Sequence, residues 1–449
     1  MKDVVIIGAG LAGTLMAIRL AQRGHKVDLY EKRPDLRKTD ISAGRSINLA
    51  LSDRGLQALA MADLDEKARE LVIPMYGRMI HGQDGSEKLY RYSGRKEDWI
   101  NSISRPGLNA LLLDEADKYD NLNLFFNHDS SKVDTINKTI QIYAQDGTVN
   151  LDVHDKIVIG ADGAGSSLRR EMQRRSNQLR YNFSQTFLDT GYKELCLPAG
   201  ADGFFQIEKN ALHIWPRDGF MMIALPNLDA SFTVTLFMRF DGPNGFDSIQ
   251  SDDHIHALFD ENFGDVKNLF PDLIHEYRTN PSSSLGTIRC YPWQIDGQFL
   301  LIGDAAHAIV PFYGQGMNCS FEDCLVLDQC ISKNEGNWEA IFKDYQSIRK
   351  QDADAIADLA EDNFYEMRDA TADPIFNRKR QIELKLEQQY PEYYSKYSLV
   401  TFKEELPYHK AMALGRKQDE LLMKIAASEN DVDQIDLGEV FQALRSIND

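Results

Sequence analysis

The apolar residues at the start of the chain change their spacing twice. Residues 4–7, VVII, form a continuous apolar run, the pattern of a strand buried on both faces. From Leu11 the apolar positions recur with helical spacing until Gly24, and a second strand-like run, VDLYE, follows at residues 27–31. This order predicts a strand, a helix and a parallel strand, the repeating unit of an α/β sheet.

Three glycines fill the turn between the first strand and the helix. Gly8 suits a tight turn, Gly10 lets backbone N–H groups approach a pyrophosphate at the positive end of the helix, and Gly13 allows close packing of helix on strand. Glu31 ends the second strand, where a carboxylate can accept both hydroxyls of an adenosine ribose. We therefore predict a dinucleotide site rather than an ordinary glycine turn.

Two later apolar runs also end in an aspartate. The pattern KIVIGAD predicts a strand that leads to Asp162, and FLLIGD predicts one that leads to Asp304. Ligands bind at the carboxyl edge of an open α/β sheet, so Asp162 is a candidate for polar contact with a cofactor, although Asp-Gly alone is more often a turn. Asp304 can bond a ribityl hydroxyl. The helix that follows can turn three backbone N–H groups toward a flavin pyrimidine edge, those of Gly316, Met317 and Asn318.

Isolated basic residues give weaker signals. Arg45 and Arg54 are candidates for cofactor phosphate contacts, although most arginines simply face solvent. His254 and His256 lie two positions apart, which indicates surface histidines rather than ligands. His307 could orient a loop beside a flavin or be a structural histidine.

The charge balance excludes some partners. The chain has 449 residues and a net charge of -19, which argues against nucleic acid and against an anionic membrane surface. No run reaches the about 18 apolar residues of a membrane span, so we expect a cytoplasmic protein. The cysteines show no C-x-x-C pair and no zinc spacing, which predicts free thiols and no metal: Cys196, Cys290, Cys319, Cys324 and Cys330.

The glycine turn, the Asp-Gly motif and the Gly-Asp motif, in this order and at these distances, resemble the three fingerprints of the FAD-dependent aromatic hydroxylases. The resemblance implies tightly bound FAD that NADPH or NADH reduces without a nucleotide domain of its own. The single G-x-G-x-x-G agrees with that arrangement. We also include Arg105 among the cofactor-binding candidates.

The resemblance and the hydrophobic pattern together predict an α/β fold with interleaved domains. A Rossmann-like FAD-binding domain takes residues 1–71, 98–175 and 285–337. Strand-like alternation assigns residues 72–97 and 176–284 to a β-sheet substrate domain. Residues 338–449 have helical spacing and form a helical C-terminal region.

Five further stretches resemble the members of this family that act on L-kynurenine: GRSINLALSDRG, YGRMIHG, PFYGQGMN, DNFYEMR and YSLVTF. Carried over residue by residue, the resemblance implies substrate contacts from Arg78, Tyr92, Asn363 and Tyr397, with Tyr90 as the alternative to Tyr92. The mitochondrial members of the family end in an apolar membrane-anchoring segment, and we expect no such anchor here because the sequence shows no segment of that kind.

The residue types suit such a substrate. An aromatic amino acid needs a fixed cation for its carboxylate, neutral hydrogen-bonding groups and aromatic walls, and arginine binds a carboxylate through two parallel bonds. Phe312 adds an aromatic wall to the set above. Without the resemblance, Arg78 and Asn363 would more often be surface residues.

The reaction implied is NADPH- and O2-dependent hydroxylation of L-kynurenine to 3-hydroxykynurenine through a flavin C4a-hydroperoxide, in tryptophan degradation toward NAD. The cofactor supplies the difficult chemistry, so we expect no protein nucleophile and no metal. Two alternatives stay open, because fold alone does not fix function. The chain could be an FAD hydroxylase or reductase for another aromatic substrate, or a non-catalytic flavin redox sensor.

Overall fold

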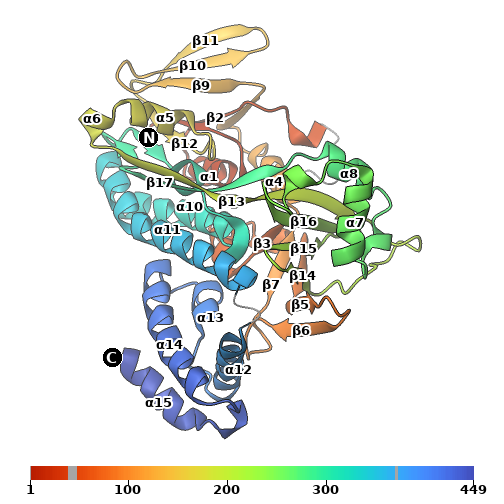
Figure 1. Ribbon diagram of the computed structural model, residues 1–449. Helices are drawn as coiled ribbons and strands as arrows, with labels where there is room; N and C mark the ends of the chain where they lie inside the picture. Colours follow the sequence, from red (N-terminus) through yellow and green to blue (C-terminus); the bar gives the residue numbers. More distant parts are fainter. Residues whose placement is uncertain (1, 39–47, 370–372, 449) are drawn as a thin grey trace.

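The computed structural model describes residues 2–38, 48–369 and 373–448 (Figure 1). Arg45 therefore lies outside the described residues. At the centre of the N-terminal part is a six-stranded sheet in the order β18-β19-β12-β1-β2-β8. Its strands are β1 (Val4–Ile7), β2 (Val27–Glu31), β8 (Leu122–Phe126), β12 (Ile157–Gly160), β18 (Gln294–Ile295) and β19 (Phe299–Leu301).

All neighbouring strands of this sheet from β19 to β8 are parallel, and only β18 is antiparallel. Val4 pairs with Val27 of β2 on one side and with Ile157 of β12 on the other. The carboxyl ends of β19, β12, β1 and β2 therefore lie next to one another. This is the arrangement that the three motifs predicted.

Helices and two small sheets surround this sheet (Figure 1). The helices are α1 (Leu11–Gln22), α2 (Asp53–Ala60), α3 (Asp65–Arg69), α4 (Arg105–Ala116), α5 (Ser167–Arg174), α6 (Ser176–Leu179), α9 (Asp304–His307) and α10 (Gly316–Lys333). One small sheet is β3 (Leu49–Leu51), β7 (Ile100–Ile103) and β4 (Val72–Met75), and the other is β11 (Gly147–Asp152), β10 (Thr139–Ala144) and β9 (Asp129–Asp134).

A seven-stranded sheet forms the second layer, in the order β17-β13-β16-β15-β14-β5-β6. Helices α7 (Asp252–Asn262) and α8 (Leu273–Thr279) contribute to the apolar core on one of its faces. The strands are β5 (Gly77–His81), β6 (Glu87–Arg91), β13 (Asn182–Leu197), β14 (Leu212–Arg217), β15 (Phe220–Pro226), β16 (Phe232–Arg239) and β17 (Ser283–Tyr291).

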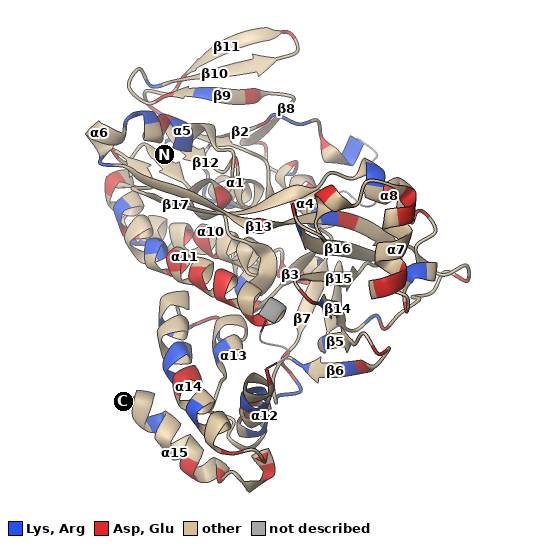
Figure 2. Ribbon diagram, viewed as in Figure 1, with Lys and Arg blue, Asp and Glu red and all other residues tan. Residues whose placement is uncertain are grey.

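The C-terminal part is helical, as predicted. It consists of α11 (Trp338–Asp369), α12 (Pro374–Gln389), α13 (Lys396–Thr401), α14 (Tyr408–Ser428) and α15 (Leu437–Asn448). Helix α11 carries both basic and acidic residues up to Lys350, and its charged residues from Asp352 to Glu366 are all acidic, whereas α12 carries the basic group Arg378, Lys379 and Arg380 (Figure 2). No helix in the described ranges is both long and apolar enough to cross a membrane.

One interpretation of the sequence is wrong. Arg54 is only 1% exposed, so it does not face solvent, and its guanidinium is occupied by protein groups rather than free for a cofactor phosphate. It donates to the carbonyl oxygens of Val400 (3.1 Å) and Lys403 (2.9 Å) and forms an ion pair with Glu322 at 3.1 Å. Arg54 therefore ties α2 to the C-terminal region.

Candidate active site

The turn after β1 is built from glycines, two of which leave no room for a side chain. Gly8 has a φ of +103°, and a Cβ atom there would lie 2.5 Å from the carbonyl oxygen of Ala161. A Cβ atom on Gly13 would lie 2.0 Å from the carbonyl oxygen of Gly8, so the start of α1 packs directly on the turn. Gly10 faces open space, because a Cβ atom there would have no neighbour within 4 Å. A pyrophosphate can therefore reach the N–H groups at the start of α1.

Glu31 is buried beside this turn. Its Oε2 accepts from the backbone N–H of Ala9 at 3.0 Å, and its Oε1 accepts from the backbone N–H of Arg33 at 3.0 Å. The carboxylate is thus fixed in position at the end of β2 before any ligand binds. Its proposed contact with a ribose would use the remaining acceptor capacity of the two oxygens.

The side-chain carboxylate of Asp162 has one oxygen in hydrogen bonds and one oxygen without a hydrogen-bond partner. Oδ2 accepts from the backbone N–H and the hydroxyl of Ser167, at 2.6 and 2.8 Å, whereas Oδ1 is buried without a partner. A buried acceptor without a donor costs free energy, and a cofactor hydroxyl can supply that donor. Asp304 and Arg105 are both exposed, at the starts of α9 and α4, and are free to contact a ligand.

The first turn of α10 presents the third part of the cofactor site. An α-helix leaves the N–H groups of its first turn without internal partners, and α10 begins at Gly316. The Asn318 side chain is occupied by the protein: it accepts from the N–H of Ser52 at 3.0 Å and donates to the carbonyl of Ala50 at 2.8 Å. The side chain of Asn318 therefore fixes this helix against β3. The free acceptors and N–H groups around the sheet edge fit FAD.

A buried charge cluster supports the Gly-Asp motif. Asp323 accepts from the N–H of Gly303 at 2.8 Å, from His307 Nε2 at 2.6 Å and from Arg349 Nε at 2.8 Å. Burial alone would raise the pKa of Asp323, but the cations of His307 and Arg349 lower it to about 2. Burial would lower the pKa of His307, and the Asp323 carboxylate raises it well above the usual value.

His307 is therefore a structural histidine in an ion pair, the second of the two predicted roles. His307, Cys319 and Asp323 lie close enough to hold a metal ion. The Arg349 guanidinium on the same carboxylate places a positive charge where the metal would sit, which disfavours that use. Asp323 and Arg349 were not predicted, because a single aspartate or arginine on a helix carries no distinguishing pattern.

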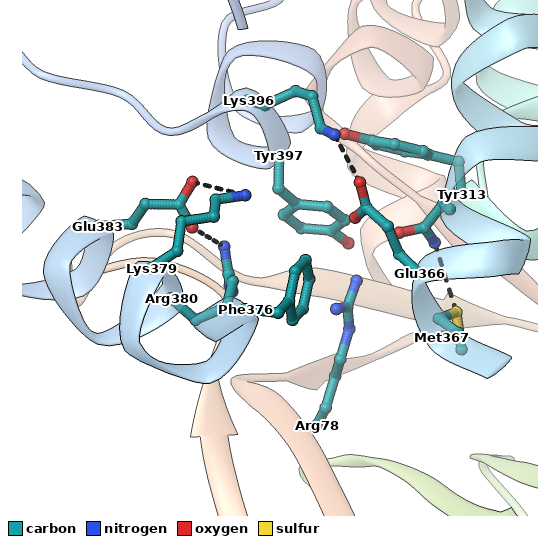
Figure 3. A pocket seen from close by; sticks show the side chains of 11 residues that line it. Arg78, Tyr313, Glu366, Met367, Phe376, Lys379, Arg380, Glu383, Lys396 and Tyr397 are labelled. Atoms are coloured by element: carbon teal, nitrogen blue, oxygen red, sulfur yellow. Dashed lines mark hydrogen bonds and ion pairs between the residues drawn. The ribbon is translucent and has the colours of Figure 1, made fainter. Parts of the chain in front are cut away.

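A pocket lies between β5 and the C-terminal helices (Figure 3). It joins segments about three hundred residues apart in the chain. Its lining is Arg78, Tyr313, Asn363, Glu366, Met367, Phe376, Lys379, Arg380, Glu383, Lys396 and Tyr397. Three of the predicted substrate contacts, Arg78, Asn363 and Tyr397, are among these residues.

The Arg78 guanidinium lies against aromatic rings. It is 4.5 Å from the ring centre of Tyr397 and 5.5 Å from that of Tyr92. The rings of Tyr92 and Tyr397 stack at 5.8 Å. Tyr92 is 2% exposed, whereas Tyr90 is 43% exposed. Arg78 Nε is buried without a hydrogen-bond partner, so part of its donor capacity is free for a ligand.

Phe312 does not line the pocket in this structure. Its carbonyl oxygen accepts from Asn363 Nδ2 at 2.6 Å, and its ring lies 4.6 Å from that of Phe364. The next residue, Tyr313, lines the pocket and stacks on Tyr397 at 5.3 Å. Gly316, where the N–H groups predicted to face a flavin begin, follows Tyr313 by three positions in the chain.

Apart from Arg78, the charged residues of the pocket were not predicted. Lys396 Nζ lies 2.6 Å from Glu366 (Figure 3). Asp419 lies 2.7 Å from Lys396 Nζ and 2.6 Å from Lys379 Nζ. Lysines and glutamates on helices usually indicate a solvated surface. Their burial follows from the packing of α12 and α13 against α14, which carries Asp419, and the sequence pattern does not reveal this packing.

The fold and the cofactor edge define an FAD-dependent hydroxylase. The family model described as FAD binding domain matches residues 1–360. Among solved structures, a p-nitrophenol 4-monooxygenase from Pseudomonas putida superimposes with a TM-score of 0.68 at 16% identity, covering 91% of this chain and 98% of that one. A 2-methyl-3-hydroxypyridine-5-carboxylic acid oxygenase mutant gives 0.66 at 19% identity, covering 88% and 99%. At this identity the likeness shows the fold.

Sequence relatives are much more similar. The kynurenine 3-monooxygenase of Myxococcus xanthus is 42% identical, covering 99% of this chain and 95% of the relative. That of Flavobacterium psychrophilum is 43% identical, covering 96% and 94%, and that of Dictyostelium discoideum is 41% identical, covering 97% and 96%. The chain belongs to the kynurenine 3-monooxygenase family.

Proposed function

We propose that this protein hydroxylates L-kynurenine to 3-hydroxykynurenine with NADPH and O2, using bound FAD. The observation that carries this proposal is an arginine with a free, buried donor in a pocket that three aromatic side chains line. One of these, Tyr313, precedes the predicted flavin turn by three positions in the chain. Arg78 is the fixed cation that an amino-acid carboxylate requires. The relatives that carry the kynurenine 3-monooxygenase name span nearly the whole chain.

Each part of the pocket then has a task. FAD, when bound and reduced by NADPH, would activate O2 so that one of its oxygen atoms can be transferred to the substrate. Arg78 binds the substrate carboxylate, and Tyr92 and Tyr397 hold the guanidinium in its orientation through their stacked rings. Asn363, anchored to the Phe312 carbonyl, keeps its oxygen available for the substrate. Burial of these groups excludes water from the reaction.

We also propose, without change, the cofactor contacts and the domain boundaries that were predicted from the sequence. Gly10 leaves room for the pyrophosphate, and Gly8 and Gly13 allow the close packing of the turn that holds it, as their surroundings support. Residues 72–97 and 176–284 act as the substrate domain, and the pocket at β5 supports this division. The remaining contacts are Glu31, Arg105, Asp162, Asp304 and the turn from Gly316 to Asn318.

Replacing Asp304 with alanine should weaken FAD binding about tenfold to hundredfold, because a hydrogen bond to a carboxylate contributes roughly 1.5 to 3 kcal/mol. Titration of the apoprotein with FAD measures this. Asp155→Ala is the matched control, since Asp155 is exposed and lies before β12, at the opposite edge of the sheet. Equal FAD affinity in Asp304→Ala and wild type would exclude the ribityl role.

The proposed reaction is tested by mass spectrometry of the product formed from L-kynurenine, NADPH and O2. We expect a product heavier by one oxygen atom, with that atom derived from O2 when labelled gas is used. NADPH oxidation without an oxygenated product would instead indicate a reductase. A flavin-containing protein with no substrate-stimulated oxidation would indicate a redox sensor.

A further inference from the structure

A second cavity lies on the other side of the substrate sheet. It measures about 260 Å³, near the lower end of ligand pockets, which start at about 300 Å³. It is lined by Lys193, Phe246, Ile249, Gln250, Ile255, Tyr277, Arg278 and Ser282, from β13, α7, α8 and the segments around them.

The direction of side chains along β13 separates this cavity from the kynurenine pocket. Lys193 points to the same face as Leu195, which packs in the core with Phe259 of α7 and Tyr277 of α8. Tyr192 points to the opposite face and packs against the core that contains Tyr397. The sheet thus stands between the two sites.

Lys193 is a buried cation without a carboxylate partner. It is 5% exposed, and its Nζ donates to the carbonyl oxygen of Asn280. Its ammonium lies 5.0 Å from the ring centre of Tyr277 and 5.8 Å from that of Phe246. In the described parts of the chain, no carboxylate forms an ion pair with it. An ammonium has three N–H donors, so at least one remains available.

Other buried lysines of this protein are paired. Lys379 and Lys396 are 4% and 11% exposed at their side chains, and each has a carboxylate oxygen within 2.7 Å. A buried charge without a counter-ion costs free energy, and burial lowers the pKa of Lys193 accordingly. An anion in the cavity would offset that cost.

Tyr277 supplies a second polar group without a partner. Its hydroxyl is buried and makes no hydrogen bond, and the residue is 6% exposed. The rest of the lining includes the apolar side chains of Phe246, Ile249 and Ile255. The cavity therefore combines a cation and a hydroxyl donor with apolar contacts on one part of its lining, and the polar side chains of Gln250, Arg278 and Ser282 complete the wall.

We propose that this cavity binds a small aromatic carboxylate, with the carboxylate on Lys193 Nζ and the Tyr277 hydroxyl and the ring between Phe246 and Ile255. The site is distinct from the one that holds L-kynurenine and takes no part in the hydroxylation. Arg278, whose side chain is 50% exposed and paired with Asp252, adds positive charge where the cavity meets solvent.

The test is calorimetric titration of benzoate into the FAD-loaded protein saturated with L-kynurenine. We expect one benzoate per chain, with benzamide, the neutral isostere, binding at least tenfold more weakly. Lys193→Met keeps the length of the side chain and should weaken benzoate binding at least thirtyfold. Tyr277→Phe should weaken it about tenfold. The turnover rate with kynurenine should be unchanged in both.

Lys209→Met is the matched control, because Lys209 also lies over an aromatic ring, that of Phe205, but is exposed. Its benzoate affinity should equal that of wild type. If benzoate binding is absent, is displaced by kynurenine, or is equal in Lys193→Met, the proposal is wrong. A Lys193→Met protein with a lower melting temperature and unchanged benzoate affinity would assign Lys193 a purely structural role. The benzoate titration is also repeated with Arg78→Ala, which should bind kynurenine only weakly. The result then does not depend on whether kynurenine occupies the other pocket.

Discussion

The variant Arg78→Ala should bind L-kynurenine about 30-fold to several thousandfold more weakly than wild type and should bind FAD with equal affinity. Removing one partner of a buried charge pair costs roughly 2 to 5 kcal/mol, which converts to this range. Arg78 Nε is buried and has no hydrogen-bond partner in the protein. It can therefore donate to the carboxylate of kynurenine in a place where solvent does not compete. Flavin absorbance during a kynurenine titration reports the dissociation constant.

Two further ligands and variants sharpen that measurement. The decarboxylated amine of kynurenine should bind wild type and Arg78→Ala equally weakly, since it lacks the group that Arg78 holds. Arg78→Lys should recover only part of the affinity, because an ammonium cannot form the paired bonds of a guanidinium. Arg91→Ala, an exposed arginine on the next strand, should leave binding unchanged. If wild type binds the amine as tightly as kynurenine, the carboxylate is held elsewhere.

The second large effect concerns stability. Asp323→Ala should reduce the free energy of unfolding by about 3 to 5 kcal/mol, because it leaves the buried cations of His307 and Arg349 without their shared carboxylate. It should also weaken FAD binding, since the N–H of Gly303 loses its acceptor. Urea unfolding followed by circular dichroism measures the first effect. Asp344→Asn, which removes an exposed ion pair with Lys333, should have little effect on the midpoint.

The same cluster gives stability a defined pH dependence. The pKa of His307 is raised in the folded protein, so its contribution is complete below the unfolded pKa of about 6.5 and is lost as pH rises through the folded value. The pKa of Asp323 is lowered to about 2, so its contribution is present above about 3.9 and is lost as pH falls toward 2. The alkaline loss should disappear in Asp323→Asn. An identical alkaline profile in that variant would contradict the role of the pair.

The sequence predicted the fold because its signals are local. The βαβ unit at residues 4–31 and the strand ends at Asp162 and Asp304 follow from periodicity and glycine placement, and all lie at one sheet edge. The substrate pocket depends on contacts between distant segments. Arg78 was found through a resemblance, and no local pattern reveals that Lys379 and Lys396 are buried beside it.

Arg54 is a second residue whose role the local sequence pattern does not reveal. Interpreted as an isolated arginine, it suggested a phosphate contact or a solvent-facing residue, yet its partners are the Glu322 carboxylate and carbonyl groups of residues 400–406. Only the packing of α13 and the following loop against α2 decides its role. The cluster around Asp323 was missed for a similar reason, since its partners come from two other helices and a turn.

The strands of the six-stranded sheet lie far apart in the sequence, and this constrains how the chain can fold during synthesis. Val4 pairs with Ile157, and β12 in turn pairs with β19 at residues 299–301. At about 5 to 20 residues per second, β1 exists for about 15 to 60 seconds before β19 is made. Until then the apolar edge of β12 has no neighbour on that side, and Arg54 lacks its carbonyl partners at residues 400–406 for longer still. We expect newly made chains to depend on chaperones over this interval, and fragments that end before β19 to aggregate.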